Sequence, residues 1–511
     1  MKKQKGVTLL AVTVYVIVMV IAIGVIATIT SFFYSNTKQI EADSKYASQF
    51  DQFNVFFLED TKEYNNQVSS YTANFVAFSN GNTYRFDAEK QAIYRNEVKI
   101  CSHVKNAIFT YQSGENNSTV SVALEIGGET QIAFSKTVSY TIVNPVDTSG
   151  GVIADGSFNQ EKGVNTPVLI GDMKPVIWDA SNNEINNMSQ ITNENWYDYN
   201  QQGYNNASRW ANAKTADGSY WVWIPRFEYK IIRAMDNSEG FIEIKFIPTS
   251  QTQADKDFTI HPVFTTKVED GGWKKEIPGF WVAKYEASNN SETPKSTFGV
   301  SSWRNLTIGD CYTKAYNYDR AKESHLMKNS EWGAVAYLAH SSYGRDAIEV
   351  SSNESTEYYT GGGAEEAYKT NLLQSTTGNI TGIYDLNGGT MELLAVWNNV
   401  VESSLLVYGQ SFASSGGTST IYATAYSNNQ SLAGSMAYTQ EVAKIGDATY
   451  EIAQGETYTW FGDACIPPTT NLPFLGRGGT SGMGDMGGIF SSVSYNGISN
   501  VSGAFRMILT P

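Results

Sequence analysis

The sequence predicts an α+β protein with an N-terminal transmembrane helix, a small helix-on-sheet domain and a larger domain rich in loops. Three observations predict this organisation. Residues 7–33 carry no charge and lead into an amphipathic helical pattern. The residues that follow, up to about position 143, alternate apolar and polar side chains, which is typical of antiparallel strands. From about Pro167 onward the chain is rich in Trp, Gly and Asn, and its short apolar runs are separated by polar loops.

The uncharged segment 7–33 is long enough to cross a bilayer. As a helix that rises about 1.5 Å per residue it would span roughly 40 Å, whereas a bilayer core is about 30 Å thick. Lys2, Lys3 and Lys5 precede the segment, and the next basic residue is Lys38. This bias places the N-terminus in the cytoplasm and the C-terminal bulk outside. We therefore expect a single-pass protein of the cell membrane, and a plain membrane anchor is the simplest form of this hypothesis.

The junction between the basic leader and the apolar run resembles the start of a type IV pilin. Lys5 and Gly6 are followed by Val7 and then Thr-Leu-Leu, as in prepilins that a peptidase cuts after the glycine and methylates at the new N-terminus. The resemblance implies a leader at residues 1–6, with prepilin peptidase and other pilin subunits as partners. The family usually has a glutamate at the fifth mature position, where this chain has Ala11. That departure implies a minor or tip subunit, because the subunit cannot neutralise the terminal amine of its neighbour.

A small domain is expected directly after this helix. Tyr46, Phe50, Phe53 and Phe57 form one apolar stripe at helical spacing, and the stripe needs a sheet to pack against. A long helix on a small antiparallel sheet is also the pilin arrangement, so pattern and resemblance both predict a pilin-like domain at residues 34–143. The strands are expected at residues 75–78, 83–86, 104–111 and 120–126, with Asn80-Gly81 as a hairpin turn. Residues 144–166 contain Gly and Pro without periodicity and are predicted to be a flexible linker.

Composition narrows the function. The 511 residues include 36 basic and 51 acidic side chains, which gives a net charge of −15. Nucleic acid is therefore not expected as a partner, because phosphate binding needs a basic patch. Three cysteines are too few for a disulfide framework. Free buried thiols are favoured, and a bridge between Cys311 and Cys465 is the alternative.

Several motifs of the larger domain, taken in order, resemble the formylglycine-generating enzyme or sulfatase-modifying-factor family, a variant of the C-type lectin fold. The resemblance implies a C-type lectin-like domain at residues 167–511. Its clearest helix is predicted at Ser330–Ala339, after a cap at Asn329 or Ser330. The segments that carry the resemblance are Trp221–Arg226, Gly279–Glu286, His325–Leu338, Gly378–Glu392, Arg477–Gly479 and Ala504–Arg506.

The enzymatic chemistry of that family is not predicted for this chain. Members that oxidise a substrate cysteine bind copper through two cysteines shortly after the Arg-Gly-Gly motif, but residues 480–490 contain none and Cys465 lies before the motif. The four histidines are not spaced as metal ligands, and metalloprotease, hydrolase and phosphate-loop motifs are missing from the sequence. An extracellular modifying enzyme of the formylglycine-generating type is thus the disfavoured alternative.

The resemblance implies one metal site without a catalytic role. The carboxylate of Glu392 and the backbone carbonyls of Asn387, Gly388 and Thr390 could hold a structural calcium ion, because hard oxygen ligands suit that ion. Gly389 stands where the family usually has an asparagine, and this weakens the match.

A lectin-like scaffold without chemistry predicts a binding protein whose ligand, a protein or a glycan, contacts the C-terminal loops. This segment also resembles the variable segment of proteins that retroelements diversify and that share the fold. The leading hypothesis is thus a surface-displayed minor or tip pilin-like adhesin, and a structural minor pilin that caps or initiates a filament is the alternative. The predicted ligand contacts are Thr480, Ser481, Met483, Asp485, Met486, Ser491, Ser492, Ser494, Tyr495, Asn496, Ser499, Asn500 and Ser502.

Overall fold

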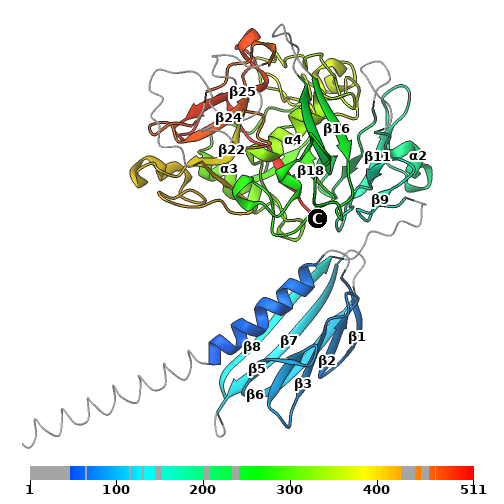
Figure 1. Cartoon of the computed structure of the whole chain (residues 1–511), viewed down its shortest axis with the longest axis vertical. Coiled ribbons are helices and arrows are strands. Elements are labelled where there is room, and N and C mark those ends of the chain that lie inside the picture. Colours follow the sequence, from blue (N-terminus) through cyan, green and yellow to red (C-terminus); the bar gives the residue numbers. More distant parts are fainter. Residues whose placement is uncertain are drawn as a thin grey trace, which may run out of the picture. The chain divides into compact units, whose positions relative to one another are not determined.

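The chain divides into two compact units, residues 1–144 and residues 145–511 (Figure 1). The computed structural model describes residues 46–63, 66–113, 117–128, 132–143, 152–199, 208–232, 241–426, 444–449, 460–466 and 468–511.

The described residues of the first unit form one helix, residues 46–62, that packs against two antiparallel sheets (Figure 1). Phe50, Phe53 and Phe57 of the predicted stripe are buried in its core, which confirms the helical pattern. The strands of the first sheet, in spatial order, are β1 (Val68–Thr72), β2 (Phe75–Phe78), β3 (Thr83–Asp87), β4 (Ala92–Arg95) and β5 (Val98–Ser102). The second sheet has the order β6 (Val104–Gln112), β7 (Asn117–Gly127) and β8 (Ile132–Val143).

Two local predictions in this unit are confirmed, whereas β1, β4 and β5 were not predicted. Gly81 has a φ of +89° in the turn between β2 and β3, a conformation that glycine adopts without a steric penalty. In β7, the alternation of Val120, Val122 and Leu124 with polar residues places those three side chains in the core.

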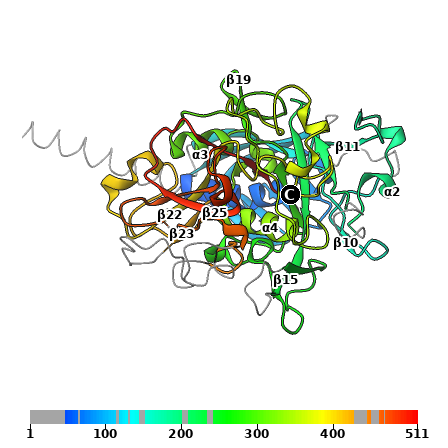
Figure 2. The same ribbon diagram turned by 90° about the horizontal axis from the view of Figure 1, so that it is seen from above.

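The larger unit is built on two main sheets, with α4 (Asn329–Ala339) buried along its whole length (Figure 2). The helix begins one residue before the predicted start, so its N-cap is Lys328 and not Asn329 or Ser330, and the Lys328 N–H donates to the Glu331 Oε2 at 2.7 Å. The seven-stranded sheet has the order β12 (Glu184–Ile185), β11 (Lys174–Trp178), β13 (Asn212–Lys214), β14 (Tyr220–Pro225), β18 (Gly279–Ala283), β27 (Met507–Leu509) and β21 (His325–Leu326). The second sheet has the order β23 (Thr424–Tyr426), β22 (Met391–Asn398), β24 (Phe474–Gly478) and β25 (Gly488–Tyr495), and β26 (Gly503–Ala504) also pairs with β22.

Smaller elements complete this unit. Two short helices, α2 (Asn193–Trp196) and α3 (Ile308–Tyr316), each begin at a capping box. The remaining strands are β9 (Phe158–Asn159), β10 (Val164–Asn165), β15 (Phe227–Ile232), β16 (Phe241–Phe246), β17 (Thr259–Ile260), β19 (Ala287–Asn290) and β20 (Thr293–Ser296).

The predicted linker at residues 144–166 is wrong in its second half. Phe158–Asn159 and Val164–Asn165 form an antiparallel pair, and Val152 and Val164 are fully buried. The Asn165 Nδ2 donates a hydrogen bond to the Ile247 carbonyl at 2.7 Å. Residues 152–166 therefore belong to the larger unit, to which the buried side chain of Asn165 links them.

The predicted fold class also needs correction. The described residues are mostly strands with few helices, so the predicted α+β class is corrected to a mainly β fold. The physical reason lies in the larger unit, where the short apolar runs between turn residues pair as strands, as the sequence predicted, and these strands outnumber the few helices among the described residues.

The predicted membrane anchor finds no support either. Within the described part of the chain, no helix combines the length and the apolar character needed to cross a membrane. The expected transmembrane helix at residues 7–33 and the expected cleavage site at Gly6 and Val7 lie outside the described residues. We therefore correct the predictions of a single-pass protein and of a cell-membrane location.

Candidate functional site: the C-terminal hairpin

The segment predicted to bind a ligand folds as the hairpin of β24 and β25. Register pairs Phe474 with Tyr495 and Arg477 with Ser492, and a bulge lies between Ser492 and Gly488. Gly488 has a φ of +144°, and a Cβ there would lie 2.1 Å from the Asp463 Oδ1. Glycine is thus required where the chain enters β25, because no side chain fits against that carboxylate.

A fully buried arginine holds this hairpin onto the core. The Arg477 Nη1 donates to the Asn329 Oδ1 at 3.1 Å and to the Asp447 carbonyl at 3.3 Å. Its Nη2 lies 3.4 Å from the Ile489 carbonyl, which also accepts a 2.7 Å bond from the indole of Trp332. Helix α4 and the start of β25 are therefore fixed to each other through buried polar contacts.

A second buried arginine, Arg506, links β22 to the end of the chain. The Arg506 Nε donates to both carboxylate oxygens of Glu392, at 2.9 and 3.1 Å, and its Nη2 also bonds that carboxylate. The guanidinium donates further to the carbonyls of Ala283 and Tyr384, at 2.7 and 2.8 Å. Burial raises the pKa of Glu392, and the charge of Arg506 opposes this rise.

Two of the four predicted calcium ligands make protein contacts. Glu392 is paired with Arg506, and the Asn387 carbonyl accepts a hydrogen bond from the Asn353 N–H at 2.8 Å. Among the described residues, no group of three or more His, Cys, Asp or Glu side chains is arranged to hold a metal ion. Glu392 is therefore an ion-pair partner in this structure, and calcium binding stays an untested prediction.

The turn at Gly388 and Gly389 instead supports the predicted binding loop. The Gly388 N–H donates to the Gly478 carbonyl at 3.0 Å, and the Ser481 N–H donates to the Gly389 carbonyl at 3.2 Å. The Met486 carbonyl accepts from the Ala464 N–H at 3.0 Å. The two segments that the sequence singled out as a metal turn and a ligand loop thus lie side by side.

The thirteen predicted ligand contacts do not form one surface. Thr480, Ser481, Met483 and Met486 are half-buried or exposed in the loop before β25. Asn496, Ser499, Asn500 and Ser502 are also half-buried or exposed, but they follow β25. The two loops lie at opposite ends of an eight-residue strand, on the order of 20 Å apart. The side chain of Asp485 lies outside the described residues.

The remaining four predicted contacts are buried in β25: Ser491, Ser492, Ser494 and Tyr495. Residues 464–466 run beside this strand, where the Ser492 N–H donates to the Ala464 carbonyl at 2.9 Å and the Ile466 N–H donates to the Ser492 carbonyl at 2.8 Å. The Tyr495 hydroxyl donates to the Ile498 carbonyl. This structure therefore does not present these four side chains to a ligand, because a neighbouring segment covers the strand.

Nucleophilic and general-base groups beside β25 are held neutral. Burial raises the pKa of Cys465 to about 12, so its thiol is protonated at neutral pH. Burial lowers the pKa of His340 to about 3, and the ring packs against both Phe461 and Phe490, with centroid distances of 4.7 and 5.0 Å. All three cysteines are free and buried, as favoured from the sequence.

Sequence reasoning missed a cluster of exposed apolar side chains at one end of this sheet. The cluster is centred on the 3₁₀ helix η7 (Ser403–Gly409), coloured gold beside β22 in Figures 1 and 2. Register places the end of β22, the start of β24 and the end of β25 together. We name this cluster the apolar end, and its residues, each between 38% and 50% exposed, are Val400, Leu405, Val407, Tyr408, Leu472 and Ile498.

Contacts between backbone segments show that the apolar end is continuous. The Asn398 N–H donates to the Pro473 carbonyl at 2.8 Å, which places Val400 near Leu472. A Cβ on Gly497 would lie 3.0 Å from the Cβ of Tyr408, so Ile498 adjoins Tyr408. The only sequence signal was the Leu-Leu-Val-Tyr run at 405–408 in an otherwise polar loop.

Comparison with known proteins assigns no family to this chain. No protein-family model matches it, and neither does any curated protein. The likenesses to type IV pilins and to the sulfatase-modifying-factor family therefore rest on their motifs alone.

Proposed function

We propose that the larger unit is a non-catalytic binding module that takes a protein ligand at the apolar end. The observation that carries the proposal is the grouping of six exposed apolar side chains from three separate segments at one end of the second sheet. Contiguous exposed apolar surface is uncommon on proteins without a partner and marks protein–protein contacts more than glycan sites.

The arrangement beneath the apolar end suits recognition. Backbone bonds from Asn305 and Ile308 to the carbonyls of Asn500 and Gly497, at 3.0 and 3.1 Å, hold the loop after β25. A held loop loses little conformational entropy when a ligand binds. The exposed polar residues Asn496 and Ser499 lie beside Ile498 and can supply the polar rim of such a site.

The proposal is tested by selecting binders to the full chain from a displayed library of random peptides and titrating them against variants. Val407→Glu, at a position 50% exposed, should weaken binding at least about tenfold, because it places a charge in the apolar contact. Val98→Glu, in the first unit and 66% exposed, is the matched control and should change nothing.

Two outcomes would overturn the proposal. Selected peptides that lose affinity with Met486→Glu but not with Val407→Glu would place the site at the other end of β25. Glycans that bind the full chain on an array while no peptide is selected would assign a different class of ligand.

A further inference from the structure

The outer edge of β8 is a long unpaired strand edge in the first unit. β7 pairs with β8 from Ile132 to Val143 on one side, and among the described residues no strand pairs with the other side. Figure 1 shows β8 at the margin of its sheet, next to the helix. Such an edge presents free backbone N–H and C=O groups, which are the natural partners of another extended strand.

β8 carries few of the devices that usually protect a strand edge. The strand contains no proline and one charged residue, the exposed Lys136, whose Nζ lies 4.9 Å from the centre of the Phe50 ring. The cation therefore lies on the helix side of the sheet and leaves the opposite face of the edge without a charge. The opposite face presents a row of small exposed polar side chains: Ser135, Thr137, Ser139 and Thr141.

The helix beside this edge has an exposed apolar flank. The Tyr140 hydroxyl donates to the Asn54 Oδ1 at 2.7 Å, so the Asn54 side of the helix faces β8. Leu58 follows Asn54 by one turn on that side and is 37% exposed, and Val55 next to it is 62% exposed. A partner that extends the sheet would thus also meet apolar surface on the helix.

We propose that the free edge of β8 pairs with β8 of a second copy of this chain, antiparallel and centred on Ser139, to form one continuous six-stranded sheet. A second copy fits because a two-fold axis brings an edge of equal length and the same chemistry. Thr137 then faces Thr141, in the kind of hydroxyl pair that Ser121 and Ser139 already make at 2.7 Å.

The same register also places compatible side chains opposite each other on the helix side of the sheet. Lys136 faces Ile142 of the copy, so no like charges are opposed, and Val138 faces Tyr140, which is a favourable cross-strand pair. The apolar flanks of the two helices lie on the same face, on either side of the axis. This pairing involves the first unit alone and is independent of the proposed ligand site.

Site-specific crosslinking of the full chain tests the pairing. In a mild nonionic detergent, which keeps the apolar residues 7–33 dispersed, oxidised Ser139→Cys should give a disulfide-linked dimer, because the paired residues would lie about 5 Å apart. Ser121→Cys is the matched control on the same face, one strand further in. Its two copies would be separated by about 14 Å, too far for a disulfide. The three natural cysteines are buried and should not contribute.

A charge exchange at the same position separates pairing from a mere loss of folding. Ser139→Lys and Ser139→Glu should each lower the dimer association constant, measured by sedimentation, by about tenfold, and an equal mixture of the two should restore it. Equal crosslinking of Ser139→Cys and Ser121→Cys, or single-charge variants that associate like the original chain, would overturn the proposal.

Discussion

The two units differ in how many charged side chains they bury. Among the described residues of the first unit, Asp60 is the one buried charged side chain. Its carboxylate accepts from Arg95 at 2.9 and 3.0 Å and from Asn82 at 2.7 Å, and the Tyr84 hydroxyl also bonds it. In the larger unit the buried charged residues include Arg226, Glu228, Lys284, Glu286, Lys328, Glu331, Asp385, Glu392, Asp463, Arg477 and Arg506.

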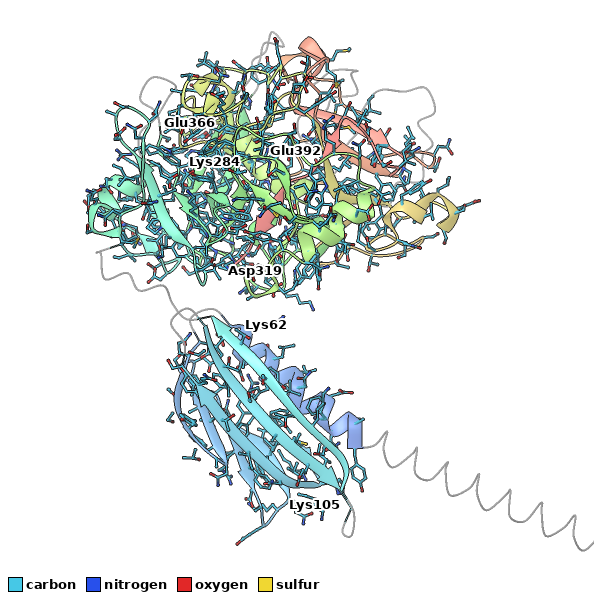
Figure 3. All side chains as sticks on the ribbon, turned by 180° about the vertical axis from the view of Figure 1, so that it is seen from behind. Lys62, Lys105, Lys284, Asp319, Glu366 and Glu392 are labelled. Carbon is cyan, nitrogen blue, oxygen red and sulfur yellow. The ribbon has the colours of Figure 1, made fainter. Side chains whose placement is uncertain are left out.

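This difference teaches how each core is held together. Around Asp60 the aromatic rings of Phe53, Phe57 and Tyr84 pack edge-to-face or stacked within 6.1 Å, so apolar contacts dominate. In the larger unit, buried charges join segments that are far apart in sequence. Lys284, labelled in Figure 3, donates to the Asn212 Oδ1 at 2.9 Å and to the Gly382 carbonyl at 2.8 Å.

The largest predicted effect comes from replacing Arg506, the ion-pair partner of Glu392. Arg506→Met should lower the free energy of unfolding of the larger unit by about 3–5 kcal/mol, because it leaves the Glu392 carboxylate buried without a partner. Denaturant unfolding followed by tryptophan fluorescence measures this unit by itself, since all eleven tryptophans of the chain lie beyond residue 145.

The double variant Glu392→Leu and Arg506→Met is the matched control. It removes both charges and should recover a large part of the loss, since an apolar pair of similar volume often replaces a buried ion pair at little cost. If the single and the double variant were equally unstable, the packing of Arg506 and not its charge would hold the sheets together.

A smaller effect is expected in the first unit, with a clear dependence on pH. Burial alone raises the pKa of Asp60, but the hydrogen bonds from Arg95, Tyr84, Asn82 and Asn80 outweigh it and leave the pKa below its ordinary value of 3.8. A lowered folded-state pKa stabilises the protein above the unfolded pKa, and this stability is lost as the pH falls through the folded value. Asp60→Asn should cost about 1–3 kcal/mol at pH 7 and little at acid pH.

Hydrogen exchange measured on peptides from residues 46–143 reports this unit separately. Asp51→Asn, at an exposed position of the same helix, is the control and should leave the exchange unchanged. Equal protection of Asp60→Asn and the original chain at pH 7 would mean that the aromatic core alone determines stability in this unit.

The comparison also explains which parts of the structure the sequence could predict. The helix at 46–62 and the β6–β7 hairpin are formed by contacts between near neighbours. The spacing of Phe50, Phe53 and Phe57 was therefore sufficient to predict the helix, and the apolar–polar alternation at 120–126 was sufficient to predict β7. The pair of Arg506 and Glu392 spans 114 positions, and no local pattern indicates it. The same is true of the hydrogen bond between Asn165 and Ile247, which made a predicted linker part of a folded unit.

The candidate site was predicted only in part for the same reason. The hairpin at 474–495 was expected as a loop-bearing segment, but the residues at 464–466 that cover β25 carry no signal of where they pack. Serines such as Ser491 and Ser492 read as surface residues by composition, whereas their burial depends on that distant segment. The exposed apolar residues Val407 and Tyr408 were overlooked because an apolar run in a loop ordinarily indicates a core contact.

The smallest predicted effect concerns Asp463 of the larger unit. Its pH dependence should have the opposite sign to that of Asp60, because its pKa is raised and not lowered. Burial, with the nearby charge of Glu349, raises the pKa of Asp463 well above its ordinary value, against the bond from the Phe490 N–H. A raised carboxylate pKa disfavours the folded state as the pH rises from the unfolded value through the folded one. Asp463→Asn should therefore stabilise the larger unit on the order of 1 kcal/mol at pH 7, because asparagine keeps an acceptor for Phe490 without the charge.

The gain should vanish at pH 3, where both chains are neutral at this position, and Asp257→Asn at an exposed position should show no gain at either pH. A variant less stable than the original chain at pH 7 would show that the ionised carboxylate is needed to hold β25, in which case both units would use buried carboxylates in the same way.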